Sequence, residues 1–135
     1  MPMLNLSVST PLSSELASNL SAALTRATNE RLGKDPSVTA VLITHAPADH
    51  WFIGNASLAS MGKNAFWLEI KVTAGTNTKA QYADYLKDVF AMMRRALGPL
   101  HETSYIVIDE VNASAWGYAG LSQEHRFVAG RIAAA

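Results

Sequence analysis

Hydrophobic and polar residues alternate along several short stretches of the chain, a pattern typical of β-strands. In residues 3–9 every second side chain is apolar, which predicts a strand with one face in the core. Residues 65–73 alternate in the same way. The run SVTAVLIT, residues 37–44, and the stretch at 103–111 are rich in β-branched residues, and the first of these predicts a more deeply buried strand.

Two longer stretches carry apolar residues at the spacing of one helix face. The first predicts a helix over residues 13–32, because a serine can cap its start and Gly33 can end it. The second predicts a helix over residues 79–97, which a glycine also ends. Each helix therefore lies between two strands.

The strand–helix–strand pattern occurs twice, so the chain contains an internal repeat. The copies span about residues 2–60 and 66–120, and the tail, residues 121–135, is expected to form a loop and a short helix. Matching positions lie 64 residues apart in the first strands and 65 apart from the end of the helix onward. The matched pairs include Leu4 with Leu68, Leu6 with Ile70, Val8 with Val72, and Trp51 with Trp116.

A helical crossover of this length joins parallel strands in a right-handed sense. We therefore predict one α+β domain over residues 1–135, in which tandem β-α-β units form a four-stranded sheet with both helices on one face. The sheet should be mainly parallel within each unit, and its other face needs a partner if Trp67 is to leave water. The rival architecture is a ferredoxin-like α+β fold with antiparallel pairing, which parallel pairing of Leu6 alongside Val41 would exclude.

Composition narrows the functional classes. Lys+Arg and Asp+Glu are equal at 11 each, which argues against a nucleic-acid or membrane-surface partner, since both need a basic excess. The chain has no cysteine, and its four histidines lack metal-ligand spacing, so we expect neither thiolate chemistry nor a metal site. It has neither an apolar run of membrane-spanning length nor a signal-peptide pattern, and we expect a cytoplasmic protein.

Pro2 is the first residue that suggests chemistry. A proline at the first position of a strand is tolerated because it lacks an amide hydrogen, and this is the structural interpretation. Methionine is usually removed when a small residue follows it, which would turn the Pro2 nitrogen into a secondary amine. Such an amine in an apolar pocket has a lowered pKa and can act as a general base near neutral pH.

The repeat and the proline together resemble the tautomerase superfamily. The stretch SVTAVLITHAPADHWFIGN and Pro2 with the first strand are similar to 4-oxalocrotonate tautomerase, whose subunit is one β-α-β unit. The doubled length, the opening PML, LGKDP after the first helix, Tyr105 and VNASAWG are similar to macrophage migration inhibitory factor. The resemblance covers about residues 2–120.

The resemblance implies site roles for five residues. Pro2 would be the catalytic base, Lys34 would hold a substrate carboxylate, and Tyr105 would reach the pocket of a neighbouring subunit. Trp51 and Trp116 occupy the aromatic position of the turn after each repeat, where one of them could wall the pocket. Each also has a plain alternative: a solvated lysine at a helix end for Lys34, a sheet-edge aromatic for Tyr105, and interface packing for the tryptophans.

Several positions depart from the family. Where 4-oxalocrotonate tautomerase has two substrate-binding arginines, this chain has Leu12 and Ala40, with Thr76 and Tyr105 in the second repeat. Val107 replaces a site asparagine of macrophage migration inhibitory factor. Strong dicarboxylate binding is therefore doubtful. Arg126, in the tail, could reach a neighbouring site and substitute for a missing arginine.

The leading hypothesis is a homotrimeric, cofactor-independent tautomerase. It would catalyse enol–keto proton transfer on a small unsaturated or aromatic 2-oxo acid, with Pro2 as general base. The alternative is a trimer of the same fold that is inactive or weakly active and serves as a binding or interaction module, as the missing arginines would favour.

Overall fold

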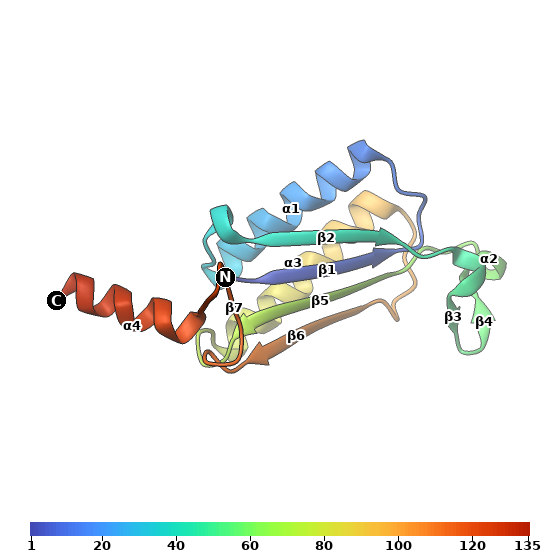
Figure 1. Cartoon of the computed structure of the whole chain (residues 1–135). Coiled ribbons are helices and arrows are strands. Elements are labelled where there is room, and N and C mark those ends of the chain that lie inside the picture. The colour runs from blue at the N-terminus through green and yellow to red at the C-terminus, as the bar shows by residue number, and fades with distance from the viewer.

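The computed structural model describes all 135 residues, and its long strands form one mixed sheet (Figure 1). The sheet has four strands in the order β2-β1-β5-β6. Their bounds are β1 Met3–Val8, β2 Ala40–His45, β5 Phe66–Thr73 and β6 Tyr105–Val111. Two long helices, α1 (Ser14–Leu32) and α3 (Lys79–Leu97), lie on the same face of this sheet (Figure 1).

Strand pairing confirms the predicted fold class. β1 pairs with β2 in parallel, with Leu4 opposite Val41 and Leu6 opposite Ile43. β5 pairs with β6 in parallel, and β1 pairs with β5 antiparallel along the centre of the sheet. The expected alignment of Leu6 with Val41 is therefore wrong by two residues along β2, but the pairing is parallel, which excludes the antiparallel ferredoxin-like alternative.

The core lies between the sheet and the two long helices. Leu4, Leu6 and Val8 of β1 are fully buried, as is every second residue of β5 from Phe66 onward. The helices contribute Leu20 and Leu24 from α1, among others. α1 is capped by the Ser13 side chain and ends at Gly33, which has φ +68° and so adopts the left-handed conformation that glycine tolerates.

The prediction for residues 37–44 was wrong in two respects. β2 begins only at Ala40, because Pro36–Val38 form a short 3₁₀ helix (η1) that the Asp35 side chain caps through the Ser37 amide. β2 is also a sheet edge, where Leu42 is 51% exposed, and is not deeply buried in the single chain. The β-branched composition identified a strand correctly but did not distinguish an edge strand from a central one.

Each repeat continues into a small hairpin and a helix. After β2 come a 3₁₀ helix η2 (Ala48–His50), the hairpin β3–β4 (Phe52–Ile53 and Ala56–Ser57) and α2 (Leu58–Met61); after β6 come β7–β8 (Gly117–Tyr118 and Leu121–Ser122) and α4 (Gln123–Ala134). Leu58 donates its amide to the Trp51 carbonyl, and Gln123 donates its amide to the Trp116 carbonyl, both at 2.9 Å. The start of the tail therefore continues the repeat, and α4 is an extended counterpart of α2.

The antiparallel pairing of β1 with β5 places the two hairpins at opposite ends of the sheet. β7–β8 lies beside the N-terminus, whereas β3, β4 and α2 lie at the far end of the sheet (Figure 1). α4 starts next to the N-terminus and runs outward from the body of the molecule (Figure 1). Neither this helix nor the two long ones combines the length and the apolar character needed to cross a bilayer.

Candidate active site

Pro2 lies at the start of β1, buried beside a pocket of about 300 Å³. Its carbonyl accepts a hydrogen bond from the Ala40 amide at 3.2 Å, which fixes the residue to the edge strand β2. The hairpin of the second repeat closes the other side of the pocket. The pocket is lined by Met1, Pro2, Met3, Val38, Ala40, Lys71, Trp116, Gly117, Tyr118 and Gln123.

A second cavity, of about 580 Å³, adjoins the first. Met1 and Gln123 line both of them, so residue 1 stands between the two spaces. The larger cavity is bounded by the end of α1, the loop that follows β5, and the start of α4. Its lining includes the charged side chains Lys34, Glu124 and Arg126.

The environment at the N-terminus favours a neutral amine. Burial lowers the pKa of the Met1 α-amine, and the positive charge of Lys34 lowers it further, while Asp35 acts in the opposite direction. Burial also lowers the pKa of Lys34 itself. The Lys34 ammonium donates to the Thr76 hydroxyl, Nζ to Oγ1 2.8 Å, which holds the lysine at the cavity wall.

Two aromatic residues from one hairpin form a wall of the Pro2 pocket. Trp116 donates its indole Nε1 to the Thr73 hydroxyl at 3.2 Å, so the ring is tied to the end of β5. Tyr118 lies next to it in the lining, and the guanidinium of Arg126 stacks over the Tyr118 ring at 3.8 Å from its centroid. These contacts give the pocket an apolar wall in a defined position.

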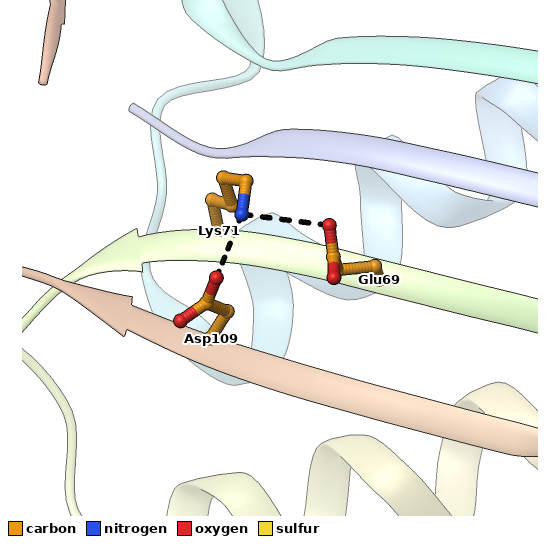
Figure 2. Close-up of polar contacts among 3 residues, drawn as sticks. All are labelled: Glu69, Lys71 and Asp109. Atoms are coloured by element: carbon orange, nitrogen blue, oxygen red, sulfur yellow. Dashed lines mark hydrogen bonds and ion pairs between the residues drawn. The ribbon is translucent and has the colours of Figure 1, made fainter.

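Lys71 brings a charged group to the same pocket from the open face of the sheet. Figure 2 shows its ammonium between two carboxylates, with Nζ 2.7 Å from Asp109 and 3.5 Å from Glu69. The hydrogen bond to Asp109 is the main cause of the raised pKa of Lys71. The lysine is therefore cationic near neutral pH, and its charge is largely balanced by its two neighbours.

Three of the five predicted site residues meet around these connected cavities: Pro2, Lys34 and Trp116. Tyr105 does not. Tyr105 is the first residue of β6 and lies opposite Trp67 of β5. Trp67 in turn lies opposite Ser7 of β1. Ser7 is five residues from Pro2, roughly 16 Å along an extended strand. Tyr105 is 57% exposed there.

Trp51 precedes β3 at the far end of the sheet and is likewise absent from the Pro2 pocket. The 64-residue offset of the first strands matches Pro2 with Phe66. Trp51 therefore lies at the end of the sheet where Phe66 occupies the position equivalent to Pro2. Phe66 is buried and lies within the chain, so it cannot provide an N-terminal amine. One chain thus forms one proline site.

Residues that sequence analysis did not assign to the Pro2 pocket include Tyr118 and Gln123. The 65-residue offset between the repeats extends to Ser57 and Ser122, the residues that cap α2 and α4. Following this offset into the tail would have drawn attention to Tyr118 and Gln123. No group of three or more histidine, aspartate and glutamate side chains is arranged to hold a metal ion.

This arrangement, a tandem β-α-β sheet with a proline at the head of its first strand, defines a tautomerase-type fold. Residues 3–61 match the sequence model of a family described as "Tautomerase enzyme". No curated protein sequence gave a significant match. The family match over the first repeat agrees with the predicted resemblance to the tautomerase superfamily.

Several solved structures share the whole fold. A symmetric trimer of fused 4-OT superposes with a TM-score of 0.80 at 16% identity, covering 92% of this chain and 98% of that one. Native fused 4-OT gives 0.79 at 20% identity, with 90% and 96% covered. A macrophage migration inhibitory factor-like protein from Entamoeba histolytica gives 0.74 at 16% identity, with 90% and 97% covered. At these identities the likeness shows the fold alone.

Proposed function

We propose that this protein is a cofactor-independent tautomerase in which Pro2, freed by removal of Met1, is the general base. Its substrate would be a small unsaturated or aromatic 2-oxo acid in enol–keto equilibrium, and the protein would act in the cytoplasm. The observation that carries the proposal is the position of Pro2, which is buried, lines the smaller pocket, and follows Met1, a residue that lines both cavities.

Loss of Met1 would have two consequences at once. The amine would move from Met1 to Pro2, which is more deeply buried, so desolvation and Lys34 should lower its pKa in the same direction. The space held by the methionine side chain would open between the two cavities. Both changes favour a neutral secondary amine next to a ligand-sized space.

The reaction then needs only proton transfer. The Pro2 nitrogen takes the enol hydroxyl proton, the carbonyl forms as the carbon–carbon double bond is lost, and the prolinium returns a proton to the carbon. Lys34 would attract the substrate carboxylate, and Trp116 would limit the access of water to the amine. No redox or group-transfer partner is required.

A homotrimer is part of this proposal. The open face and edges of the sheet leave Trp67 42%, Leu42 51% and Tyr105 57% exposed, which is unusual unless a further copy covers them. The fused 4-OT structure described above is a trimer. Contact with neighbouring copies is also the route by which Tyr105 and Trp51 would reach a proline site, since within one chain they lie at the other end of the sheet.

The test begins with an intact mass measurement, which should show protein lacking one methionine. Ketonisation of phenylenolpyruvate, followed by its ultraviolet absorbance, should then be accelerated by the wild-type protein. Pro2→Ala should lower kcat/KM by about 10²-fold, in the range expected for loss of a tuned general base. A variant with Gly-Ser placed before Pro2 makes the nitrogen an amide, and it should lose the activity altogether. Full activity in that extended variant would refute the mechanism.

A second function, that of a non-catalytic binding module, is favoured by one observation. The positions that carry substrate-binding arginines in 4-oxalocrotonate tautomerase hold Leu12 and Ala40 here. This alternative predicts rates equal to buffer on several enol acids, even for protein whose mass proves that Pro2 is free.

A further inference from the structure

Arg126 and Lys34 approach one cavity from two different parts of the chain. Lys34 follows the end of α1, and Arg126 lies in the first turn of α4. Both line the space of about 580 Å³ that adjoins the Pro2 pocket. A cavity lined by two cationic side chains is suited to an anionic ligand.

Arg126 is held in position by its neighbours. One terminal nitrogen donates to the Tyr118 carbonyl, Nη2 to O 2.9 Å, and the guanidinium plane lies over the Tyr118 ring. The Nε–H is buried and has no hydrogen-bond partner. A buried cationic donor without an acceptor is rare in folded proteins, and a guanidinium presents its Nε–H and a terminal N–H together to a carboxylate.

The remaining charges around the cavity do not satisfy these cations. Glu124 is in the lining but is exposed, and it forms no ion pair with Arg126 or Lys34. Lys34 donates to the neutral hydroxyl of Thr76 and forms no ion pair with a carboxylate. The lining therefore combines two cations with one solvated carboxylate.

We infer that Arg126 and Lys34 form an anion-binding subsite that takes the carboxylate of the ligand. The Arg126 guanidinium would donate to a carboxylate oxygen while it stays stacked on Tyr118, and Lys34 would supply a second charge from the end of α1. The remainder of the ligand passes through the space next to residue 1 toward Pro2. The inference that this carboxylate belongs to the substrate rests on the proposed tautomerase function. The inference that the subsite binds an anion does not depend on that function.

α4 is then a specificity element. It is the extended counterpart of α2, and the stacking of Arg126 on Tyr118 ties its first turn to the wall of the Pro2 pocket. The corresponding helix of the first repeat has only four residues, and its last one, Met61, occupies the position that matches Arg126. The subsite therefore exists only at the end of the sheet that carries Pro2.

The test uses binding of cinnamate, an unsaturated aromatic carboxylate that cannot tautomerise, to the full chain lacking Met1. Titration calorimetry should show that cinnamate binds at least 10-fold more tightly than the uncharged cinnamamide. Arg126→Gln should remove most of this difference without changing cinnamamide binding. Glu124→Gln should leave cinnamate binding equal or tighter, because it removes a negative charge from the lining. Arg131→Gln is the matched control, an exposed arginine further along α4, and should bind as wild type.

Two further variants separate the possible outcomes. Arg126→Lys keeps the charge but not the planar stacking, and should retain part of the preference for cinnamate, which guards against a mere folding defect in Arg126→Gln. Pro2→Ala should lose about 10²-fold in ketonisation yet keep the preference for cinnamate over cinnamamide, so failure of the catalytic proposal would leave this one standing. Equal binding of cinnamate and cinnamamide, or wild-type cinnamate binding by Arg126→Gln, would overturn the inference.

Discussion

Lys34 donates a hydrogen bond to Thr76, with Nζ 2.8 Å from Oγ1, and this contact joins the end of α1 to the loop that follows β5. Asn77 reinforces the same junction by donating to the carbonyl of Leu32 at 2.9 Å. The lysine is thereby held beside the N-terminal amine, where its charge acts on the group that would carry out catalysis. Its position is set by both repeats together.

Lys34→Gln should shift the pH dependence of ketonisation. The Lys34 ammonium disfavours a protonated amine nearby and so lowers the amine pKa; without it, that pKa rises. The acidic limb of kcat/KM against pH reports the base of the free enzyme, so the limb should move to higher pH. Lys63→Gln, an exposed lysine between α2 and β5, is the control and should leave the profile in place. An unmoved limb in Lys34→Gln would show that the two groups do not interact.

Tyr105 should act in a site formed with another subunit. Within one chain it lies opposite Trp67, at the end of the sheet remote from Pro2. Pro2→Ala and Tyr105→Phe proteins should each be impaired, but refolding a mixture should restore activity in about a quarter of the sites if subunits assemble at random. Recovery is measured as the initial rate of the mixture against each parent. A mixture no faster than its parents would confine Tyr105 to its own chain or remove it from the site.

The sheet and the long helices were predictable because their patterns are long and repeated. The alternation in residues 3–9 and 65–73 matches the buried faces of β1 and β5, and the predicted first helix differs from α1 by one residue. Parallel pairing followed from the helical crossovers. The antiparallel pairing of β1 with β5 could not be predicted in this way, because it depends on the long connection between the repeats and no short sequence pattern indicates it.

The site was less predictable because its walls come from short elements. Each strand of the hairpin β7–β8 has two residues, too few for any periodicity to identify. Arg126 was considered for a neighbouring site, yet it stacks on Tyr118 of its own chain, a contact that exists only because the hairpin turns the backbone toward α4. Such contacts depend on tertiary geometry that residue spacing does not encode.

The buried hydrogen bond between Thr28 and Tyr85 gives a test of how the two helices are joined. The hydroxyls lie 2.9 Å apart between α1 and α3, and burial raises the pKa of Tyr85 to about 12, so its phenol stays protonated at ordinary pH. Thr28→Val leaves the Tyr85 hydroxyl without a partner and should cost about 1–3 kcal/mol of unfolding free energy. Tyr85→Phe should cost less, because Thr28 still donates to the Leu24 carbonyl at 2.7 Å.

The double variant Thr28→Val with Tyr85→Phe completes this cycle. Both hydroxyls are then absent, so it should be more stable than Thr28→Val alone. Urea unfolding at one fixed protomer concentration measures all four proteins, because subunit association contributes to apparent stability. A double variant less stable than both single variants would show that packing volume, and not the unpaired hydroxyl, determines the cost.

Gly117→Ala should disable the site while sparing the core. A Cβ at position 117 would lie 2.0 Å from the Leu121 carbonyl oxygen, and since this is a backbone atom, the hairpin β7–β8 would have to open. The hairpin contributes no residue to the main core cluster, so the unfolding free energy should change little. It does line the Pro2 pocket, through Trp116, Gly117 and Tyr118, and it positions Arg126. We therefore expect kcat/KM for ketonisation to fall at least 10-fold and cinnamate binding to weaken with it.

Gly130→Ala is the matched control for that substitution. Gly130 lies within α4, where a Cβ meets no atom within 4 Å, so this variant adds the same methyl group without a clash and should favour the helix. Circular dichroism and urea unfolding establish that both variants are folded. Wild-type kinetics and wild-type cinnamate binding in Gly117→Ala would mean that the hairpin is not a wall of the site. Loss of both, with stability retained, would place the ligand between this hairpin and the N-terminal amine.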